Sequence, residues 1–437
     1  MNYDTILSHF NITQLNDMQK AAMEAIPKQN DVVLISPTGS GKTLAFLLPI
    51  LQLLHDNQYQ FQILIVVPSR ELAIQIEQVF KKMGTAFKIN ACYGGHSVKT
   101  EEHNFLQPPT ILVGTPGRIA HHLRAKNINA HTIHTLILDE FDKSLEFGFK
   151  HEMEFIIQQC VNLKKRILTS ATQLEEIPTF VGLQNNVQLN YTKESHQLDA
   201  FLTIKSVNVK DDDKLEALML LLGKINAQSA IVFCNHREAV NRISEQLHFF
   251  KIDHGYYHGG LEQIDREKTL IKLRNGSIKL LITTDLAARG LDIPEIDTVI
   301  HYQLPMTEDV MIHRNGRTAR MKSQGTVYFL LDKNDVLPSF LKDTPEKEIL
   351  PDKFIIPTPS LWKTLYIGGG KKDKINKMDI VGMLLQKGQL QKEDLGKIEV
   401  LDYSAYIAIK ADKIVNTLNT IKNQKIKNKK IKMDISS

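Results

Sequence analysis

Apolar runs of strand length alternate along the chain with longer segments of helical periodicity. In the first 200 residues these runs lie at residues 63–67, 111–113, 135–138 and 166–168, and each ends in a polar motif. Helical segments separate the runs, so the pattern is β-α repeated and predicts a parallel sheet. Ligands of such sheets gather at the carboxyl ends of the strands, which is where the polar motifs lie.

A second β-α series begins near residue 201. Its apolar runs lie at residues 230–233, 280–283, 298–300 and 326–331. A run of closely spaced glycines followed by Lys and Thr occurs in the first series, at residues 39–43, and not in the second, so the two series are not expected to bind the same ligand in the same way. We interpret this series as a second domain that closes on the first.

A third unit follows prolines at positions 351, 357 and 359. Its pattern predicts strand, helix, strand, strand, helix, strand, which is the order of an RNA-recognition sheet, at residues 364–367, 378–386, 397–401, 405–409, 411–421 and 425–433. Tyr366 and Tyr406 would lie on the two middle strands, where aromatic rings can stack bases. A core or surface role for both tyrosines is the alternative.

The predicted fold class is therefore α/β, with two parallel-sheet domains and a small C-terminal α+β domain like an RNA-recognition motif. The expected boundaries are residues 1–200, 201–345 and 362–437, with a linker at 346–361. A chain of 437 residues is too long for one core and suggests about three domains.

The most specific motif is V-V-L-I-S-P-T-G-S-G-K-T at residues 32–43. It predicts a strand, a glycine turn and a helix start, whose backbone N–H groups can surround the phosphates of a nucleoside triphosphate. Lys42 can reach the β- and γ-phosphates, and the Thr43 hydroxyl can hold Mg²⁺. The remaining loop contacts are expected from Thr38, Gly39, Ser40 and Gly41. A glycine turn that merely caps a helix is the alternative.

Two carboxylates and one amide complete the expected ATP site. Asp139 and Glu140 end the apolar run at 135–138, so Asp139 can hold Mg²⁺ and Glu140 can orient or deprotonate the attacking water. Gln19 lies in the first turn of a helix predicted at 17–26, which Asp17 is placed to cap. Its amide matches the donor and acceptor of an adenine edge.

Composition adds the class of partner. Hydrophobic residues make up 42% and charged residues 24%, as in soluble globular proteins. We expect no secretory signal and no membrane span, and the three scattered cysteines favour reduced thiols in the cytosol. Beyond Pro351 there are 17 Lys and no Arg against 9 acidic residues. This basic portion favours a polyanion partner, although a merely solvated lysine-rich surface would have the same charge.

The ordered motifs of the first series resemble the first RecA-like domain of the DEAD-box RNA helicases. They are S-P-T-G-S-G-K-T, P-S-R-E-L from Pro68, G-G at 94–95, T-P-G-R from Thr115, D-E-F-D from Asp139 and S-A-T from Ser170. The resemblance implies RNA contacts from Pro68, Arg70, Gly95, Thr115, Gly117 and Arg118. It also implies coupling of ATP hydrolysis to RNA binding through Ser170 and Thr172. Phe141 stands where the family has Ala in its tetrad.

The second series resembles the second half of the same family in H-G-G-L-E-Q-I-D-R from His258, T-D-L-A-A-R-G-L-D-I from Thr284 and H-R-N-G-R-T-A-R from His313. Arg317 and Arg320 lie three residues apart, and two guanidiniums can stabilise a γ-phosphate as arginine fingers. The resemblance implies that Asp292 couples the ribose to closure and that Gln263, Arg266 and Thr283 lie near RNA.

The last portion resembles the C-terminal domain of DbpA-like helicases, in T-L-Y-I-G-G-G-K-K-D-K-I and A-Y-I-A-I. That resemblance implies binding to a hairpin of 23S ribosomal RNA during large-subunit assembly, with phosphate contacts from Lys371, Lys372 and Lys374. We expect a monomeric, cytoplasmic RNA helicase that uses ATP and Mg²⁺. The alternatives are an ATP-gated RNA clamp or degradation scaffold without ribosomal specificity, and a DNA helicase.

Overall fold

The computed structural model describes residues 3–37, 39–55, 60–95, 97–173, 176–192, 202–210, 213–226, 228–288, 293–319, 324–341, 343–427 and 429–436. The chain forms two compact units. Unit 1 holds Met1–Ala200, and unit 2 holds Phe201–Arg289 with Ile293–Ser437. Both domains that the sequence predicts beyond residue 200 therefore belong to unit 2.

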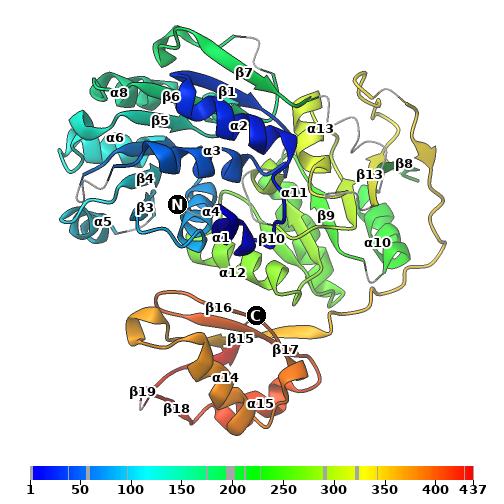
Figure 1. Ribbon diagram of the computed structural model, residues 1–437. Coiled ribbons are helices and arrows are strands. Elements are labelled where there is room, and N and C mark those ends of the chain that lie inside the picture. Colours follow the sequence, from blue (N-terminus) through cyan, green and yellow to red (C-terminus); the bar gives the residue numbers. More distant parts are fainter. Residues whose placement is uncertain are drawn as a thin grey trace. The chain divides into compact units, whose positions relative to one another are not determined.

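Unit 1 contains a seven-stranded parallel sheet in the order β3-β4-β2-β5-β6-β1-β7 (Figure 1). Its strands are β1(Asp31–Ile35), β2(Ile63–Val66), β3(Ile89–Cys92), β4(Ile111–Gly114), β5(Thr135–Leu138), β6(Lys165–Ser170) and β7(Asn186–Asn190). The predicted strands are confirmed. The sequence did not predict β3 and β7, because asparagine and glutamine interrupt their short apolar pattern.

Helices cover both faces of this sheet. One hydrophobic core lies under α2(Asp17–Lys28), α3(Lys42–Ile50) and α4(Arg70–Lys82), and the other lies under α5(Val98–Phe105), α6(Pro116–Arg124), α7(Phe141–Glu146) and α8(Lys150–Gln159). Along β2, Ile63 and Ile65 enter the first core while Leu64 and Val66 enter the second. This alternation is expected of a strand that is buried on both faces. The first helix, α1(Tyr3–Ser8), contributes Ile6 and Leu7 to the first core.

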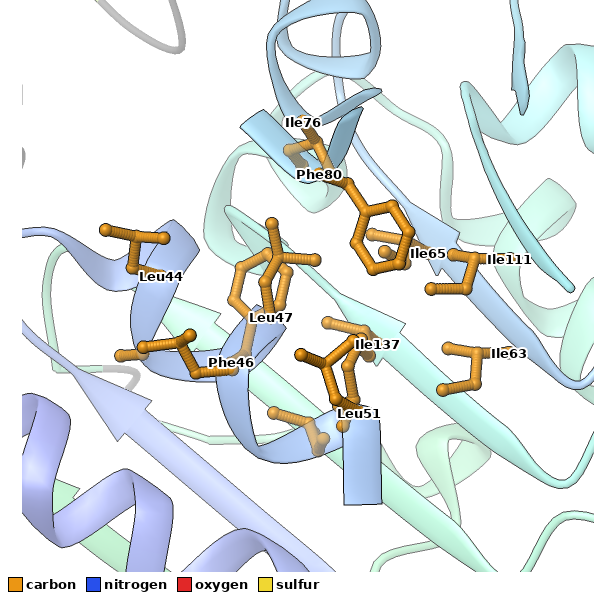
Figure 2. Packing of buried hydrophobic residues seen from close by; sticks show 14 of the residues in the cluster. Leu44, Phe46, Leu47, Leu51, Ile63, Ile65, Ile76, Phe80, Ile111 and Ile137 are labelled. Atoms are coloured by element: carbon orange, nitrogen blue, oxygen red, sulfur yellow. The ribbon is translucent and has the colours of Figure 1, made fainter. Parts of the chain in front are cut away.

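The first core fixes the start of α3, which carries Lys42. Figure 2 shows Phe46 and Leu47 of α3 and Phe80 of α4 in one cluster with Ile65 and Ile137 of the sheet. Burial of each such side chain contributes roughly 1.5–3 kcal/mol. The glycine turn is therefore held between a rigid strand and a rigid helix.

Unit 2 contains a second parallel sheet in the order β10-β11-β9-β12-β13-β8-β14. Its strands are β8(Leu202–Asn208), β9(Ala230–Phe233), β10(Gly255–Tyr257), β11(Leu280–Thr283), β12(Thr298–His301), β13(Gly325–Leu331) and β14(Glu346–Lys347). Its helices are α10(Lys214–Ile225), α11(Arg237–Phe249), α12(Gln263–Arg274) and α13(Glu308–Asn315). The four apolar runs predicted here are all strands.

The C-terminal part of unit 2 is a four-stranded antiparallel sheet in the order β16-β17-β15-β20. Its elements are β15(Trp362–Ile367), α14(Lys377–Gln386), β16(Leu395–Val400), β17(Ala405–Lys410), α15(Ile414–Ile421) and β20(Met433–Ile435). The prediction of one strand at residues 425–433 was wrong. Lys427 adopts φ 49°, so the chain reverses there into a hairpin of β18(Lys425–Ile426) and β19(Lys429–Lys430) before β20 begins. Among the described residues, no helix combines the length and the apolar character that crossing a bilayer requires.

Candidate nucleotide and nucleic-acid sites

The phosphate loop has the backbone that the sequence predicts. Gly39 and Gly41 adopt φ 85° and 89°, a left-handed conformation that side chains disfavour, and Gly41 is the N-cap of α3. A Cβ atom on Gly41 would lie 2.6 Å from Gln19 Nε2, so a side chain at this position would displace the Gln19 amide. Thr38 lies outside the described residues.

Gln19 joins α2 to the phosphate loop. Its Nε2 donates to the Gly41 carbonyl at 3.3 Å, and its Oε1 accepts from the Asn16 backbone N–H at 3.1 Å. Asn16 Oδ1 accepts in turn from the Gln19 backbone N–H at 2.8 Å. The prediction that Asp17 caps this helix was wrong, because the extended backbone of Asn16 makes it the capping residue. Adenine recognition by Gln19 stays a prediction.

The interior of the loop fits a phosphate group. Lys42 Nζ donates to the carbonyls of Ser36 and Pro37, the latter at 3.1 Å, so the ammonium lies inside the loop. Ser40 Oγ is buried and has no hydrogen-bond partner within the described part of the chain. A phosphate oxygen would satisfy this hydroxyl, and Lys42 would exchange the two carbonyls for phosphate oxygens. The half-buried Thr43 follows in the first turn of α3.

Asp139 and Glu140 follow β5, and β6 separates this strand from β1. Asp139 is only 3% exposed, and burial raises the pKa of its carboxyl although Thr169 donates a hydrogen bond to it and Lys42 lies near. Glu140 adopts φ 48°, and its N–H is shared between Asp139 Oδ1 at 3.1 Å and Thr169 Oγ1 at 3.2 Å. A buried carboxylate with so few donors fits a magnesium ligand. Thr169, which holds both residues in place, belongs to no motif that the sequence shows.

The S-A-T motif contacts the phosphate loop through the backbone. The Ser36 N–H donates to the Ser170 carbonyl at 3.1 Å. Ser170 Oγ donates to the Thr172 carbonyl at 2.6 Å and accepts from the Thr172 N–H at 3.2 Å. Ser170 and Thr172 thus form one turn next to the phosphate loop. Their role in coupling ATP hydrolysis to RNA binding stays a prediction.

Phe141, the departure from the family tetrad, is fully buried in the second core of unit 1. Its ring centroid lies 6.5 Å from that of Phe180. The side chain therefore stabilises the start of α7, while Asp139 and Glu140 keep the contacts described above. The larger residue is accommodated by the core.

The motifs predicted to contact RNA follow three neighbouring strands. P-S-R-E-L follows β2, T-P-G-R follows β4 and G-G follows β3, on the half of the sheet away from β1. Gly95 adopts φ 86°, and a Cβ atom there would lie 2.5 Å from Arg70 Nη1. Pro68 is buried at the end of β2, whereas Thr115 begins α6 and a Cβ on Gly117 would meet open space. The structure thus brings all these motifs to one edge.

Arg118 is held by a buried acid that the sequence analysis missed. Its Nε lies 2.8 Å from Glu101 Oε2, which also lies 2.7 Å from His122 Nε2. Glu101 Oε1 accepts from the Tyr93 N–H at 3.2 Å. Glu101 is 2% exposed. It therefore fixes Arg118 relative to the G-G loop, and no motif singled it out because a lone Glu on a helix is usually a surface residue.

In unit 2 the H-R-N-G-R-T-A-R motif is organised by Arg314, which the sequence analysis did not single out. This fully buried guanidinium donates from Nε to Asp285 Oδ1 at 2.5 Å, from Nη2 to Asn235 Oδ1 at 2.7 Å and from Nη1 to the Gln303 carbonyl at 2.8 Å. Burial, together with the charge of Arg314, lowers the pKa of His301 to about 3. His301 is therefore neutral near pH 7.

The other predicted residues of unit 2 lie in different settings. Arg317 is 1% exposed and follows α13, and Arg266 is buried on α12. Gln263 Nε2 donates to Glu267 Oε1 at 3.1 Å. Thr283 is fully buried, and its hydroxyl donates to the Tyr257 carbonyl at 2.8 Å. Asp292 and Arg320 lie outside the described residues. The roles predicted for these residues stay predictions.

The two tyrosines of the C-terminal sheet lie side by side on its middle strands, as predicted. Tyr366 pairs with Tyr406 across β15 and β17, and their ring centroids are 5.4 Å apart. Leu365 and Ile367 enter the core under the helices, so Tyr366 and Thr364 are on the opposite face. Tyr406 is only 4% exposed.

Within unit 2 that face lies against α12 and the turn after it. Arg274 donates to both carboxylate oxygens of Glu399, at 3.0 and 2.7 Å. Asn275 Nδ2 donates to Thr364 Oγ1 at 2.9 Å. Burial raises the pKa of Tyr406, and carboxylates on α12 add to this effect. The face of the C-terminal sheet that carries Tyr366 and Tyr406, which we call the tyrosine face, is thus docked on the domain that contains the parallel sheet of unit 2. Base stacking by Tyr366 stays a prediction.

Comparisons with known proteins match each of the three domains. Residues 16–179 match the family model for DEAD/DEAH box helicases, residues 213–322 that for the helicase conserved C-terminal domain, and residues 364–435 that for the DbpA RNA binding domain. The ATP-dependent RNA helicase DbpA of Escherichia coli is 30% identical over 97% of this chain and 95% of its own length. The chain belongs to the DEAD-box ATP-dependent RNA helicases of the DbpA type.

Two further similarities agree with this assignment. The ATP-dependent RNA helicase DbpA of Bacillus subtilis is 29% identical over 97% of this chain and 95% of its own length. The structure of S. cerevisiae Dbp5 bound to RNA and ADP BeF3 matches with a TM-score of 0.66 and 25% identity, covering 75% of this chain and 86% of that one. As a DEAD-box helicase the chain binds ATP and RNA. Its fold of two RecA-like domains and a small C-terminal domain is the predicted one.

Gly95 offers a test of the RNA contacts predicted at the ends of β2, β3 and β4. The Gly95→Ala variant is expected to cost about 1–2 kcal/mol of stability, because a side chain must adopt positive φ. It should also displace the Arg70 guanidinium, whose Nη1 a Cβ would approach to 2.5 Å, and so weaken RNA binding. Titration of single-stranded RNA checks this, with Gly148→Ala as the control. Gly148 also has positive φ, but a Cβ there would meet nothing within 4 Å. Equal RNA affinities of the two variants would contradict the expectation.

Asp394 offers a pH test of the C-terminal domain of the helicase. Lys413 forms an ion pair with this carboxyl, the Gln391 N–H donates a hydrogen bond to it, and Lys410 lies near. Together these contacts lower the pKa of Asp394 to about 2. The stabilisation is therefore fully present above pH 4, the usual aspartate range, and is lost as the pH falls through about 2. We expect Asp394→Asn to be less stable than the native chain at pH 7, with the difference vanishing below pH 2. Denaturant unfolding followed by the emission of Trp362, the single tryptophan, measures the free energy of unfolding of both proteins at each pH. A difference between the two free energies that does not change with pH would contradict this expectation.

Proposed function

We propose that this helicase locally unwinds structured RNA and is directed to 23S ribosomal RNA during assembly of the large ribosomal subunit. The observation that carries the proposal is the joining of both helicase domains to a segment, residues 364–435, that matches the DbpA RNA binding domain. A general RNA helicase would not need this basic appendage. The proposal includes a monomeric, cytoplasmic enzyme.

The proposed chemistry of ATP hydrolysis follows from the phosphate loop and the end of β5. Lys42 and the loop N–H groups hold the phosphates, and Ser40 Oγ donates to one of their oxygens. Mg²⁺, when bound, would neutralise phosphate charge, and Asp139 and Thr43 are the residues that would hold it. Glu140 orients the attacking water and accepts its proton.

The proposed RNA contacts lie on the other half of the same sheet edge. Arg70, set by Gly95, and Arg118, set by Glu101, donate to phosphates of one strand. A strand that is bound and bent at this edge no longer fits its partner in a duplex, so local strand separation follows. Arg317 and Arg320 remain the proposed arginine fingers that stabilise charge on the γ-phosphate.

Strand release distinguishes unwinding from ATP-gated clamping. A short RNA duplex joined to a fragment of 23S RNA would be mixed with the full chain and ATP, and released strand and phosphate would be measured together. We expect strand release that needs hydrolysable ATP and that falls when the duplex is joined to unrelated RNA of equal length. ATP-dependent binding without strand release would instead support a clamp.

A further inference from the structure

Three segments of the C-terminal domain meet to form what we call the lysine surface. They are the 3₁₀ turn η7(Lys371–Asp373), the β16–β17 turn and the β18–β19 hairpin. The Lys371 and Lys372 N–H groups donate to the carbonyls of Leu401 and Asp402, each at 2.9 Å. Its exposed cationic side chains are Lys371, Lys372, Lys374, Lys427, Lys429 and Lys430.

Glycine and ion pairs hold these segments together. A Cβ atom on Gly370 would lie 2.2 Å from the Leu401 carbonyl, so η7 approaches the β16–β17 turn as closely as only glycine permits. On the other side, Lys427 Nζ donates to the Lys374 carbonyl at 2.7 Å, and Lys429 Nζ lies 3.1 Å from Asp373. The lysine surface is therefore one built surface rather than three separate loops.

One exposed aromatic side chain lies at this surface. Tyr403 is 70% exposed, although it belongs to a domain whose other aromatic residues on the sheet are half-buried or buried. The Leu401 N–H donates to the Ser404 carbonyl at 2.8 Å, which places Asp402 and Tyr403 at the tip of a two-residue turn. Because the Asp402 carbonyl accepts from Lys372, the backbone of Tyr403 is fixed next to the lysines.

The sheet face, by contrast, is already occupied in unit 2. The contacts of Glu399 with Arg274 and of Thr364 with Asn275 hold it against α12, and Lys363 adds an ion pair with Asp253 at 2.7 Å. RNA on that face would have to break these contacts. Stacking on an exposed tyrosine beside lysines needs no such change.

We propose that Tyr403 stacks an unpaired base of RNA whose backbone phosphates lie on the lysine surface, while the tyrosine face of the sheet serves to dock the C-terminal domain. This inference rests on the proposed function only in taking RNA as the ligand of the domain. What it adds to the binding of a hairpin is the role of Tyr403, which needs an unpaired base because only unpaired bases can leave their own stack.

The test uses the full chain without nucleotide and two RNAs of equal length, a hairpin with an unpaired loop and a blunt duplex. Loss of one base stack should weaken hairpin binding of Tyr403→Ala by about 5- to 150-fold and leave duplex binding unchanged. Tyr403→Phe keeps the ring and should bind as the native chain does. Val415→Ala, which removes another exposed apolar side chain of the domain, is the matched control.

Trp362 gives a second readout, because it lies at the docked face. A Cβ atom on Gly276 would be 3.7 Å from its ring, and one on Gly396 would be 3.3 Å from it. Its emission should stay unchanged when the hairpin binds. Unchanged hairpin affinity of Tyr403→Ala, or a red shift of Trp362 emission on binding, would overturn the inference and favour Tyr366.

The two proposals can fail separately. If Tyr403→Ala loses hairpin binding but the native chain does not prefer large-subunit ribosomal RNA, only the ribosomal target is wrong. If that preference is present and Tyr403→Ala retains it fully, only the role of Tyr403 is wrong.

Discussion

Glu140→Gln is expected to lower the rate of RNA-stimulated ATP hydrolysis by about 100- to 10,000-fold, the usual contribution of a general base. The amide keeps the size of the side chain but cannot accept a proton from water. The backbone contacts of Glu140 with Asp139 and Thr169 should persist, so ATP and RNA should still bind. Steady-state phosphate release and ATP-dependent RNA binding measure the two properties on the same sample.

Glu146→Gln is the matched control for this variant. Glu146 lies on the same helix, α7, but its side chain is 46% exposed and pairs with Lys143. Lys143 is fully buried but keeps its ion pair with Asp142 at 3.3 Å, so Glu146→Gln should lower stability and leave the hydrolysis rate of the folded protein unaltered. Equal hydrolysis by the native chain and Glu140→Gln would remove Glu140 from the proposed chemistry.

Arg314→Ala should destabilise unit 2 by about 3–5 kcal/mol, the cost of removing one partner from a buried ion pair. Asp285 would lose two charge-assisted hydrogen bonds, and Asn235 and the Gln303 carbonyl would each lose a donor. Urea unfolding followed by Trp362 emission reports this loss, since that residue belongs to unit 2. ATP hydrolysis should fall as well, because the next arginine of the motif, Arg317, donates its N–H to the Arg314 carbonyl at 3.2 Å.

Arg237→Ala supplies the comparison for a surface arginine of the same unit. Its side chain is 65% exposed and pairs with the neighbouring Glu238, which is exposed as well, so the expected change in stability is within about 1 kcal/mol. A similar small change in Arg314→Ala would show that the motif does not depend on this buried guanidinium.

The parts of the fold that could be predicted from the sequence are those with unbroken local patterns. The runs at 63–67 and 135–138 became β2 and β5 because both faces of each strand are buried, which requires continuous apolar residues. β7, Asn-Val-Gln-Leu-Asn, lies at the sheet edge and has exposed positions, so its pattern was too weak to recognise.

The candidate site divides in the same way. The placement of Lys42 and the glycines in one turn before α3, and of Asp139 at the end of β5, could be predicted because a local motif and an apolar run determine them. Thr169, Glu101 and Arg314 could not, because each acts by holding another residue across the fold. Such partners are joined by tertiary structure alone. The docking of the tyrosine face was likewise invisible, since a sequence pattern identifies a sheet face but not what covers it.

The most direct test of the account is the ATPase rate of the full chain with large-subunit ribosomal RNA, generic single-stranded RNA and DNA. Each should be repeated on a variant in which Lys371, Lys372 and Lys374 are replaced by glutamine. The account predicts strong stimulation by ribosomal RNA, reduction of that stimulation to the generic level in the variant, and none by DNA. Equal stimulation by all RNAs in both proteins would contradict the ribosomal target and leave a general RNA helicase.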